Sequence, residues 1–260
     1  MWVSGAGMRS SAWALDALAN DVANVNTPGF KAVMPEVSSL TPVAAYPAGL
    51  AGGPKVQPVV LADGGAVPGR LILNDGQGGL RQTGQPLDLA VNGSGMFTLR
   101  TAAGGVVYTR AGAFGVDANG TIVDGQGQVL LGVSGQPLVL PAGAQPSTVS
   151  VAGNGVLTVQ VAGQTQTVGQ VGLALVPDPQ QLVGTAAGDW AAGPGTGPIS
   201  VVAPGSGGAG QLASGFLESS NVSLARVLPD VLAAERAYQL NAQALTASDK
   251  MATQVNQLSI

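Results

Sequence analysis

The chain has 260 residues, with 10 Lys or Arg against 14 Asp or Glu, and only 9% of its residues are charged. The absence of His and Cys excludes a His-based catalytic triad, a His or thiolate zinc site and a disulfide framework. A net charge of −4 without clustered Lys or Arg excludes phosphate-backbone binding, so we expect no nucleic-acid partner. A surface with so few charges fits a subunit buried against neighbours, or a genomic bias toward Ala, Gly and Val, and composition alone favours neither.

No run of apolar residues is long enough to span a bilayer, so we expect no membrane insertion. The N-terminal stretch has an apparent cleavage site at residues 17–19. It lacks a basic region apart from Arg9, and Asp16 interrupts its apolar run. We therefore expect no cleaved signal peptide.

The pattern at the N-terminus predicts a helix over about residues 4–25. Pro28 and Gly29 then favour a sharp turn after the Asn-rich end of the helix. Apolar or small residues recur in steps of three and four, which is typical of a helix seam that packs on a partner. This predicted seam consists of Met8, Ala12, Leu15, Ala19 and Val22.

The C-terminal pattern predicts a second helix over about residues 222–258. It carries two apolar stripes, so a single partner helix cannot cover it. The first stripe is Leu224, Leu228, Val231, Tyr238, Ala242, Leu245 and Ala252, and the second is Leu240, Ala244, Ala247, Met251, Val255 and Leu258. Pro229 leaves two alternatives open: the helix starts there, or it is kinked there.

The region between the helices is predicted to be mainly antiparallel β structure. Asn119-Gly120 and Asn154-Gly155 each separate two apolar runs, which indicates two hairpins. A further strand is expected over residues 168–176. The fold class is mixed α and β, with the terminal helices paired as a coiled-coil layer. The expected domains are a discontinuous helical domain (1–31 and 216–260), an extended, partly strand-like connector (32–70), a β domain (71–133) and a second β-rich region with a loop-rich return (134–215).

The sequence gives only weak evidence for a catalytic or ligand-binding site. Asp117 and Asp124 precede Gly-containing turns and are typical turn residues, and residues 117–121 lack the spacing and closing Glu of a calcium loop. The glycines of residues 93–95 do not open a helix, as a dinucleotide site requires. We therefore expect no catalytic residue, cofactor or metal. A cell-wall hydrolase using a carboxylate pair remains an alternative, with Asp88, Asp117 and Asp124 as the carboxylates it could draw on.

Several segments resemble the bacterial flagellar rod and hook protein family. Residues 19–31 (ANDVANVNTPGFK) resemble its N-terminal signature, with Asp21 where that pattern has Asn. Further segments that resemble family motifs, in the same order, are residues 87–97 (LDLAVNGSGMF), 108–114 (YTRAGAF), 218–222 (ESSNV), 235–242 (ERAYQLNA) and 248–251 (SDKM).

The resemblance implies a non-enzymatic structural subunit, most like the distal rod members, that forms a helical homopolymer and transmits torque from motor to hook. It implies other rod proteins, the hook protein and the ring bushing around the rod as partners. It also implies a place in the basal body, outside the cytoplasmic membrane, after export by the flagellar secretion apparatus. The alternatives are a proximal rod protein, another hook–basal-body homologue or, in another class, a secreted β-rich adhesin.

Residues expected to take part in subunit assembly come from both helices, the turn and one strand end. Arg110 has two open interpretations: it pairs with an acidic group across a subunit contact, or it is a solvated strand residue. The full predicted set is Leu15, Leu18, Ala19, Val22, Asn24, Phe30, Arg110, Leu224, Val231, Tyr238, Asn241, Leu245 and Met251.

Overall fold

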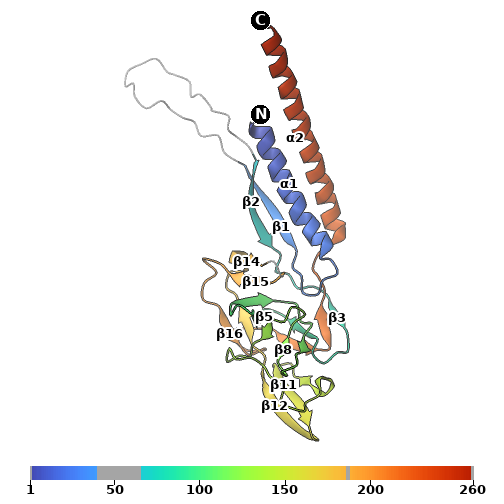
Figure 1. The fold of residues 1–260 in the computed structure, drawn as a ribbon, viewed down its shortest axis with the longest axis vertical. Helices are drawn as coiled ribbons and strands as arrows, with labels where there is room; N and C mark the ends of the chain where they lie inside the picture. Colours follow the sequence, from blue (N-terminus) through green and yellow to red (C-terminus); the bar gives the residue numbers. More distant parts are fainter. Residues whose placement is uncertain (1, 40–65, 186–187, 259–260) are drawn as a thin grey trace, which may run out of the picture. The chain divides into compact units, whose positions relative to one another are not determined.

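The computed structural model describes residues 2–39, 66–185 and 188–258 (Figure 1). The chain forms two compact units. The helical unit comprises Met1–Ala23, Val33–Ile72 and Ser223–Ile260, and the β unit comprises Asn24–Ala32 and Leu73–Val222. The two terminal helices are in contact, and a mainly antiparallel β region is inserted between them in the sequence. This confirms the predicted fold class. The finer four-part division stays a prediction.

The helical unit is built on α1 (Trp2–Ala23) and α2 (Leu224–Leu258), which lie side by side (Figure 1). Strands β1 (Val33–Ser39) and β2 (Ala66–Leu73) pair in a two-stranded sheet. These strands fall in the segment predicted as an extended connector. The remaining Pro-rich part of that prediction, residues 40–65, lies outside the described residues.

The seam of α1 differs from the predicted one. The buried residues of α1 are Gly7, Ser10, Ala14, Leu18 and Asp21. In the predicted set, Ala19 is exposed and Met8, Ala12, Leu15 and Val22 are half-buried. Small residues explain the difference, because a Cβ on Gly7 would lie 2.7 Å from Asn241 Oδ1. At Gly7 the two helices thus pack with no room for a side chain against Asn241.

Pro229 lies inside α2, which begins at Leu224, so the alternative that the helix starts at Pro229 is wrong. Proline has no N–H to donate to the carbonyl four residues earlier, here that of Ala225. Both residues are exposed, so water can reach that carbonyl. A proline is tolerated at this position because the lost hydrogen bond is on the solvated surface.

The β unit contains short strands in several sheets. The largest sheet in the described residues has the order β14–β15–β6–β5–β9–β8–β7, with β13 joining β5 to β16. Smaller sheets are formed by β10–β11–β12, β17–β4 and β18–β3. The bounds are β3 Leu80–Gln82, β4 Leu89–Asn92, β5 Met96–Arg100, β6 Val106–Thr109, β7 Gly115–Val116, β8 Ile122–Val123, β9 Val129–Leu130, β10 Ser150–Val151, β11 Val156–Val161, β12 Gln164–Gln170, β13 Leu173–Leu175, β14 Leu182–Gly184, β15 Trp190–Ala192, β16 Ser200–Val202, β17 Gln211–Ser214 and β18 Phe216–Glu218.

Both predicted hairpins are present. The Asn119-Gly120 turn joins antiparallel β7 and β8, and Asn154-Gly155 joins antiparallel β10 and β11. The strand predicted over 168–176 is wrong, because the chain leaves β12 at Gln170 and joins another sheet as β13. Gly172 permits this passage, since a Cβ there would lie 2.9 Å from the carbonyl carbon of Gly132.

The core of the β unit is apolar and continuous across its sheets. Phe97 and Phe114 stack edge to face with ring centroids 5.2 Å apart. Around them, the inward positions of alternating strands supply aliphatic side chains, as a half-buried sheet requires. Fully buried members of this core are Leu89, Val91, Phe97, Leu99, Ile122, Leu130, Leu157, Val159, Val171 and Leu173.

Candidate functional site: a buried charge cluster and exposed helix stripes

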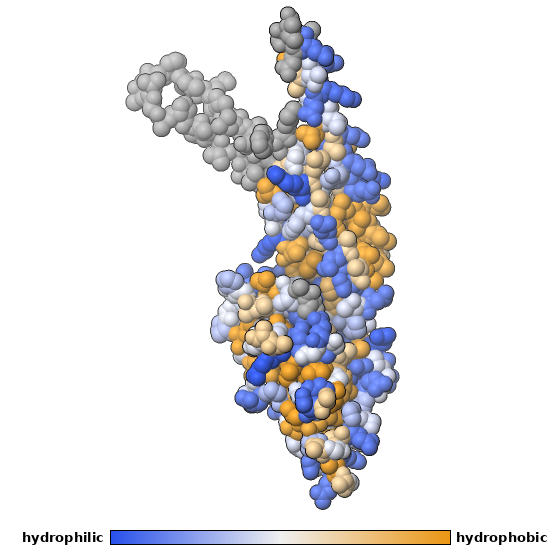
Figure 2. All heavy atoms as spheres, viewed as in Figure 1, coloured by the Kyte–Doolittle hydropathy of each residue, from blue (hydrophilic) through white to orange (hydrophobic). Residues whose placement is uncertain are grey.

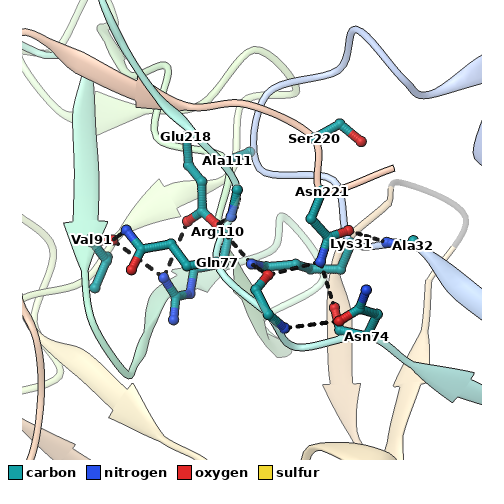
Figure 3. A network of polar contacts seen from close by, with 12 residues as sticks. Lys31, Ala32, Asn74, Gln77, Val91, Arg110, Ala111, Glu218, Ser220 and Asn221 are labelled. Atoms are coloured by element: carbon teal, nitrogen blue, oxygen red, sulfur yellow. Dashed lines mark hydrogen bonds and ion pairs between the residues drawn. The ribbon is translucent and has the colours of Figure 1, made fainter. Parts of the chain in front are cut away.

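Three charged side chains meet inside the β unit. Lys31 follows the turn after α1, Arg110 follows β6, and Glu218 ends β18. Lys31 Nζ lies 2.7 Å from Glu218 Oε1, and Arg110 Nη1 lies 3.1 Å from Glu218 Oε2 (Figure 3). Only 1% of the Lys31 and Glu218 side chains is exposed, and 7% of that of Arg110. We call these three residues the charge cluster.

Backbone groups complete the charge cluster. Glu218 Oε1 also accepts a hydrogen bond from Gly78 N at 2.8 Å. Lys31 Nζ donates to Gly76 O, and Arg110 donates to Gly93 O and Val91 O. Burial lowers the pKa of Lys31 below its ordinary value, while the hydrogen bond and charge of Glu218 act in the opposite direction. One carboxylate therefore serves two buried cations.

The turn after α1 is hydrogen-bonded to the segment that contains Glu218. Gly29 N donates to Glu218 O at 2.7 Å, and Gly29 has φ +73°. Asn221 Oδ1 accepts from Ala32 N at 2.7 Å, while Asn221 Nδ2 donates to the carbonyl of Asn74 (Figure 3). Residues of three sequence motifs thus have structural roles: they join the chain before and after the β region to a single point of the β unit.

Sequence reasoning found part of this cluster. Arg110 was expected to pair across subunits or to be solvated; instead it is buried and pairs with Glu218 of its own chain. Phe30 is half-buried, and Asn24 is half-buried and accepts from the Thr27 hydroxyl. Lys31 and Glu218 were missed as site residues. Their signal was present, because each is a lone charge in a chain that carries few.

The Asp21 carboxylate, at the end of α1, is a second buried charge and lies in the helical unit. It is 2% exposed, and both of its oxygens lie 3.1 Å from Val33 N. Burial raises the pKa of Asp21 to about 6, although the hydrogen bond from Val33 opposes the rise. Asp21 therefore fixes the start of β1 to α1, at the cost of holding a carboxylate away from water.

This pKa predicts a pH dependence of the helical unit. The folded carboxyl takes up a proton near pH 6 and the unfolded one near 3.8, so the free energy of unfolding falls as pH rises through this window. The difference is on the order of 3 kcal/mol between about pH 4 and pH 7. Asp21→Asn keeps an acceptor for Val33 N and should remove this pH dependence. Urea unfolding of the wild type and the variant across this pH range, followed by helical circular dichroism, measures the free energy of unfolding of each. Parallel pH curves for the two proteins would contradict the prediction.

Helix α2 exposes apolar residues on two sides of the seam that packs on α1. At 100° per residue, Leu224, Leu228 and Leu232 lie on one side of the seam, and Leu240, Met251 and Val255 lie on the other. Each is between 41% and 66% exposed, and Figure 2 shows hydrophobic residues on the surface of the helices. We call these two sets the apolar stripes of α2. They require more partners than α1 provides.

The structure places the other predicted assembly residues at various depths. Leu18 is buried; Leu15, Val22, Val231, Asn241 and Leu245 are half-buried; Ala19 and Tyr238 are exposed. Leu224 and Met251 belong to the apolar stripes. The role of each in subunit assembly stays a prediction. Among the described helices, none combines the length and apolar character needed to cross a membrane.

Comparison with known proteins gives the class: structural subunits of the flagellar rod and hook. The family profile "Flagellar hook protein FlgE/F/G D1 domain" matches residues 90–159, and "Flagellar basal body rod FlgEFG protein C-terminal" matches residues 213–258. The chain is 34% identical to the flagellar basal-body rod protein FlgG of Bacillus subtilis, covering 94% of this chain and 93% of the relative. The FlgG protein of Caulobacter vibrioides is 30% identical, covering 98% and 97%. The chain belongs to the FlgG family of flagellar basal-body rod proteins.

One match is to a hook protein rather than to a rod protein. The flagellar hook protein FlgE of Treponema pallidum is 35% identical over 143 residues, which is 51% of this chain and 30% of that protein. Family membership makes the protein a structural component of the flagellar basal-body rod, and this is not an enzyme family. The secreted adhesin considered from sequence is not favoured by these matches.

Proposed function

We propose that this rod subunit polymerises as a helical homopolymer, with α1 and α2 in an inner coiled-coil layer, to form the distal part of the shaft that transmits torque from motor to hook. The observation that carries the proposal is the pair of apolar stripes on α2, which flank the α1 seam. Apolar side chains exposed on two further sides of a helix indicate that other chains cover them. Contacts that repeat without closing produce filaments.

The neighbours in this proposal are other rod proteins and the hook protein, in keeping with the matches to both kinds of relative. The ring bushing around the rod is a further proposed partner. We propose export without a cleaved signal peptide through the flagellar secretion apparatus and a final place outside the cytoplasmic membrane. The close passage of α1 against Asn241 at Gly7 supports a stiff helical layer, because small seam residues leave little room for sliding.

The test is to place a charge in one apolar stripe. Leu240 is 66% exposed, so Leu240→Asp should leave the fold of the monomer intact. Losing the burial of one leucine at each subunit contact costs about 1.5–3 kcal/mol, which is at least a tenfold loss in each association step. We expect sedimentation velocity to show loss of polymer and a deletion strain complemented with this variant to remain non-motile.

Gln254→Asp is the matched control, because Gln254 is exposed on α2 between the two stripes and the substitution adds the same charge. This control should assemble and restore swimming. If Leu240→Asp also assembles and supports swimming, the stripes are not the assembly surface and the proposal fails.

A further inference from the structure

The two apolar stripes of α2 lie at different heights on the helix as well as on different sides of it. The first stripe is centred near residue 228 and the second near residue 249. At 1.5 Å and 100° per residue, these centres are about 30 Å apart along the helix axis and about 150° apart around it. The first stripe therefore covers the start of α2, the second covers its C-terminal half, and the two face in nearly opposite directions.

The C-terminal end of α2 extends past the seam with α1. Half-buried positions recur along α2 as far as Ser248. From Asp249 to Val255 every residue is exposed, and Figure 1 shows α2 running beyond the start of α1. The upper part of the second stripe is thus accessible to a neighbouring molecule.

Charged residues alternate with the stripes along each side of α2. The side that carries the second stripe has Arg226 and Asp230 at the height of the first stripe. The side that carries the first stripe has Asp249 and Lys250 at the height of the second. All four residues are exposed in the single chain. Each side of the helix is therefore apolar at one height and charged at the other.

This alternation disfavours neighbouring α2 helices that pack at the same height. Leu228 of one copy would then face Arg226 and Asp230 of the next, and Met251 would face Lys250 in the same way. Taking charged groups out of water against apolar side chains is unfavourable. A shift of one copy by about 30 Å along the helix axis places apolar residues against apolar residues and leaves the charged ones outside the contact.

We propose that the second stripe of one copy packs against the first stripe of a second copy, with their α2 helices parallel and staggered by about 30 Å. This inference rests on the proposed polymerisation and names the surface through which it occurs. Because the two stripes differ and face in nearly opposite directions, identical copies can repeat the contact without closing. A stripe paired with the same stripe of another copy would close a dimer and leave the other stripe uncovered.

Engineered cysteines test the contact in rods, because the chain has no cysteine of its own. A deletion strain is complemented with full-length Leu228→Cys combined with Ala247→Cys, Met251→Cys or Val255→Cys, which together sample one helical turn of stagger in either direction. A disulfide requires Cα atoms within about 7 Å, and these pairs are about 28 Å or more apart within one α2. After oxidation, we expect at least one pair to give a ladder of multimers on non-reducing gels of purified basal bodies.

Leu228→Cys combined with Ala233→Cys is the matched control. Ala233 is exposed on the side of the second stripe but at the height of the first, so this pair cross-links only if the helices are not staggered. Leu228→Cys alone should also stay monomeric, since a dimer would mean that like stripes meet. Cross-linking of either control would overturn the proposal. Swimming cells in which none of the three test pairs cross-links would also overturn it, as when another rod protein covers one stripe, and would leave polymerisation itself standing.

A charge exchange tests the same contact without cysteines. Leu228 and Met251 are 53% and 61% exposed, so substitutions there should leave the fold of the monomer intact. Leu228→Lys and Met251→Glu each place a charge against an apolar stripe and should each abolish swimming. The double variant places opposite charges across the staggered contact and should regain motility. A double variant that swims no better than either single variant, or single variants that swim normally, would overturn the proposal.

Discussion

Replacing Glu218 by Gln should lower the free energy of unfolding of the β unit by about 3–5 kcal/mol, the range found when one partner of a buried ion pair is removed. Glu218 is the single carboxylate in contact with Lys31 and Arg110, and all three side chains are nearly inaccessible to water. The amide of Gln has the same size but no charge, so it leaves two buried cations without a counter-ion. Its NH₂ group also places a donor against a cation. Urea denaturation of the wild type and the variant measures the difference.

Glu36→Gln provides the control for this prediction. Glu36 Oε2 lies 3.2 Å from Arg70 Nε, but the two side chains are 51% and 62% exposed. Exposed pairs of this kind contribute about 0–1 kcal/mol, so the control should unfold almost as the wild type does. If the Glu218 and Glu36 variants lose similar stability, the charge cluster does not hold the β unit together.

The parts of the fold that were predictable from sequence depend on local signals. The periodicity of apolar residues located both helices to within about two residues, and Asn-Gly located both hairpins, because these patterns act over a few neighbouring residues. Gly172 is the informative failure. Its alternating neighbours Leu173 and Leu175 favoured one continuous strand, but the path of the chain there depends on the backbone of Gly132, forty residues away.

The pairing within the charge cluster was beyond prediction for the same reason. Lys31 and Glu218 are separated by 187 positions in the chain, and no local pattern states that they pair. The seam of α1 was missed on different grounds. Apolar side chains indicate contact in a sequence, whereas at Gly7 the contact with Asn241 depends on the absence of a side chain. A seam of small residues gives a weak hydropathy signal although it permits the tightest packing.

Replacing Gly29 by Ala should destabilise the β unit by about 3 kcal/mol or more. Gly29 has φ +73°, which costs an L-residue about 1–2 kcal/mol, and a Cβ there would lie 2.2 Å from Ala111 N. The clash is with backbone that cannot rotate away, and overpacking of this kind adds about 1–3 kcal/mol. The clash would also move the turn away from Glu218 and weaken the hydrogen bond that Gly29 N donates to the Glu218 carbonyl.

Gly84→Ala separates the two contributions to this effect. Gly84 has φ +76°, almost the same as Gly29, but a Cβ at Gly84 would meet nothing within 4 Å. It should therefore lose only the conformational part, about 1–2 kcal/mol. Parallel urea denaturation of the two variants gives the cost of the close contact by difference. If the two losses are equal, the packing of the turn on the segment after Arg110 contributes nothing, and the motif glycine is explained by its backbone conformation alone.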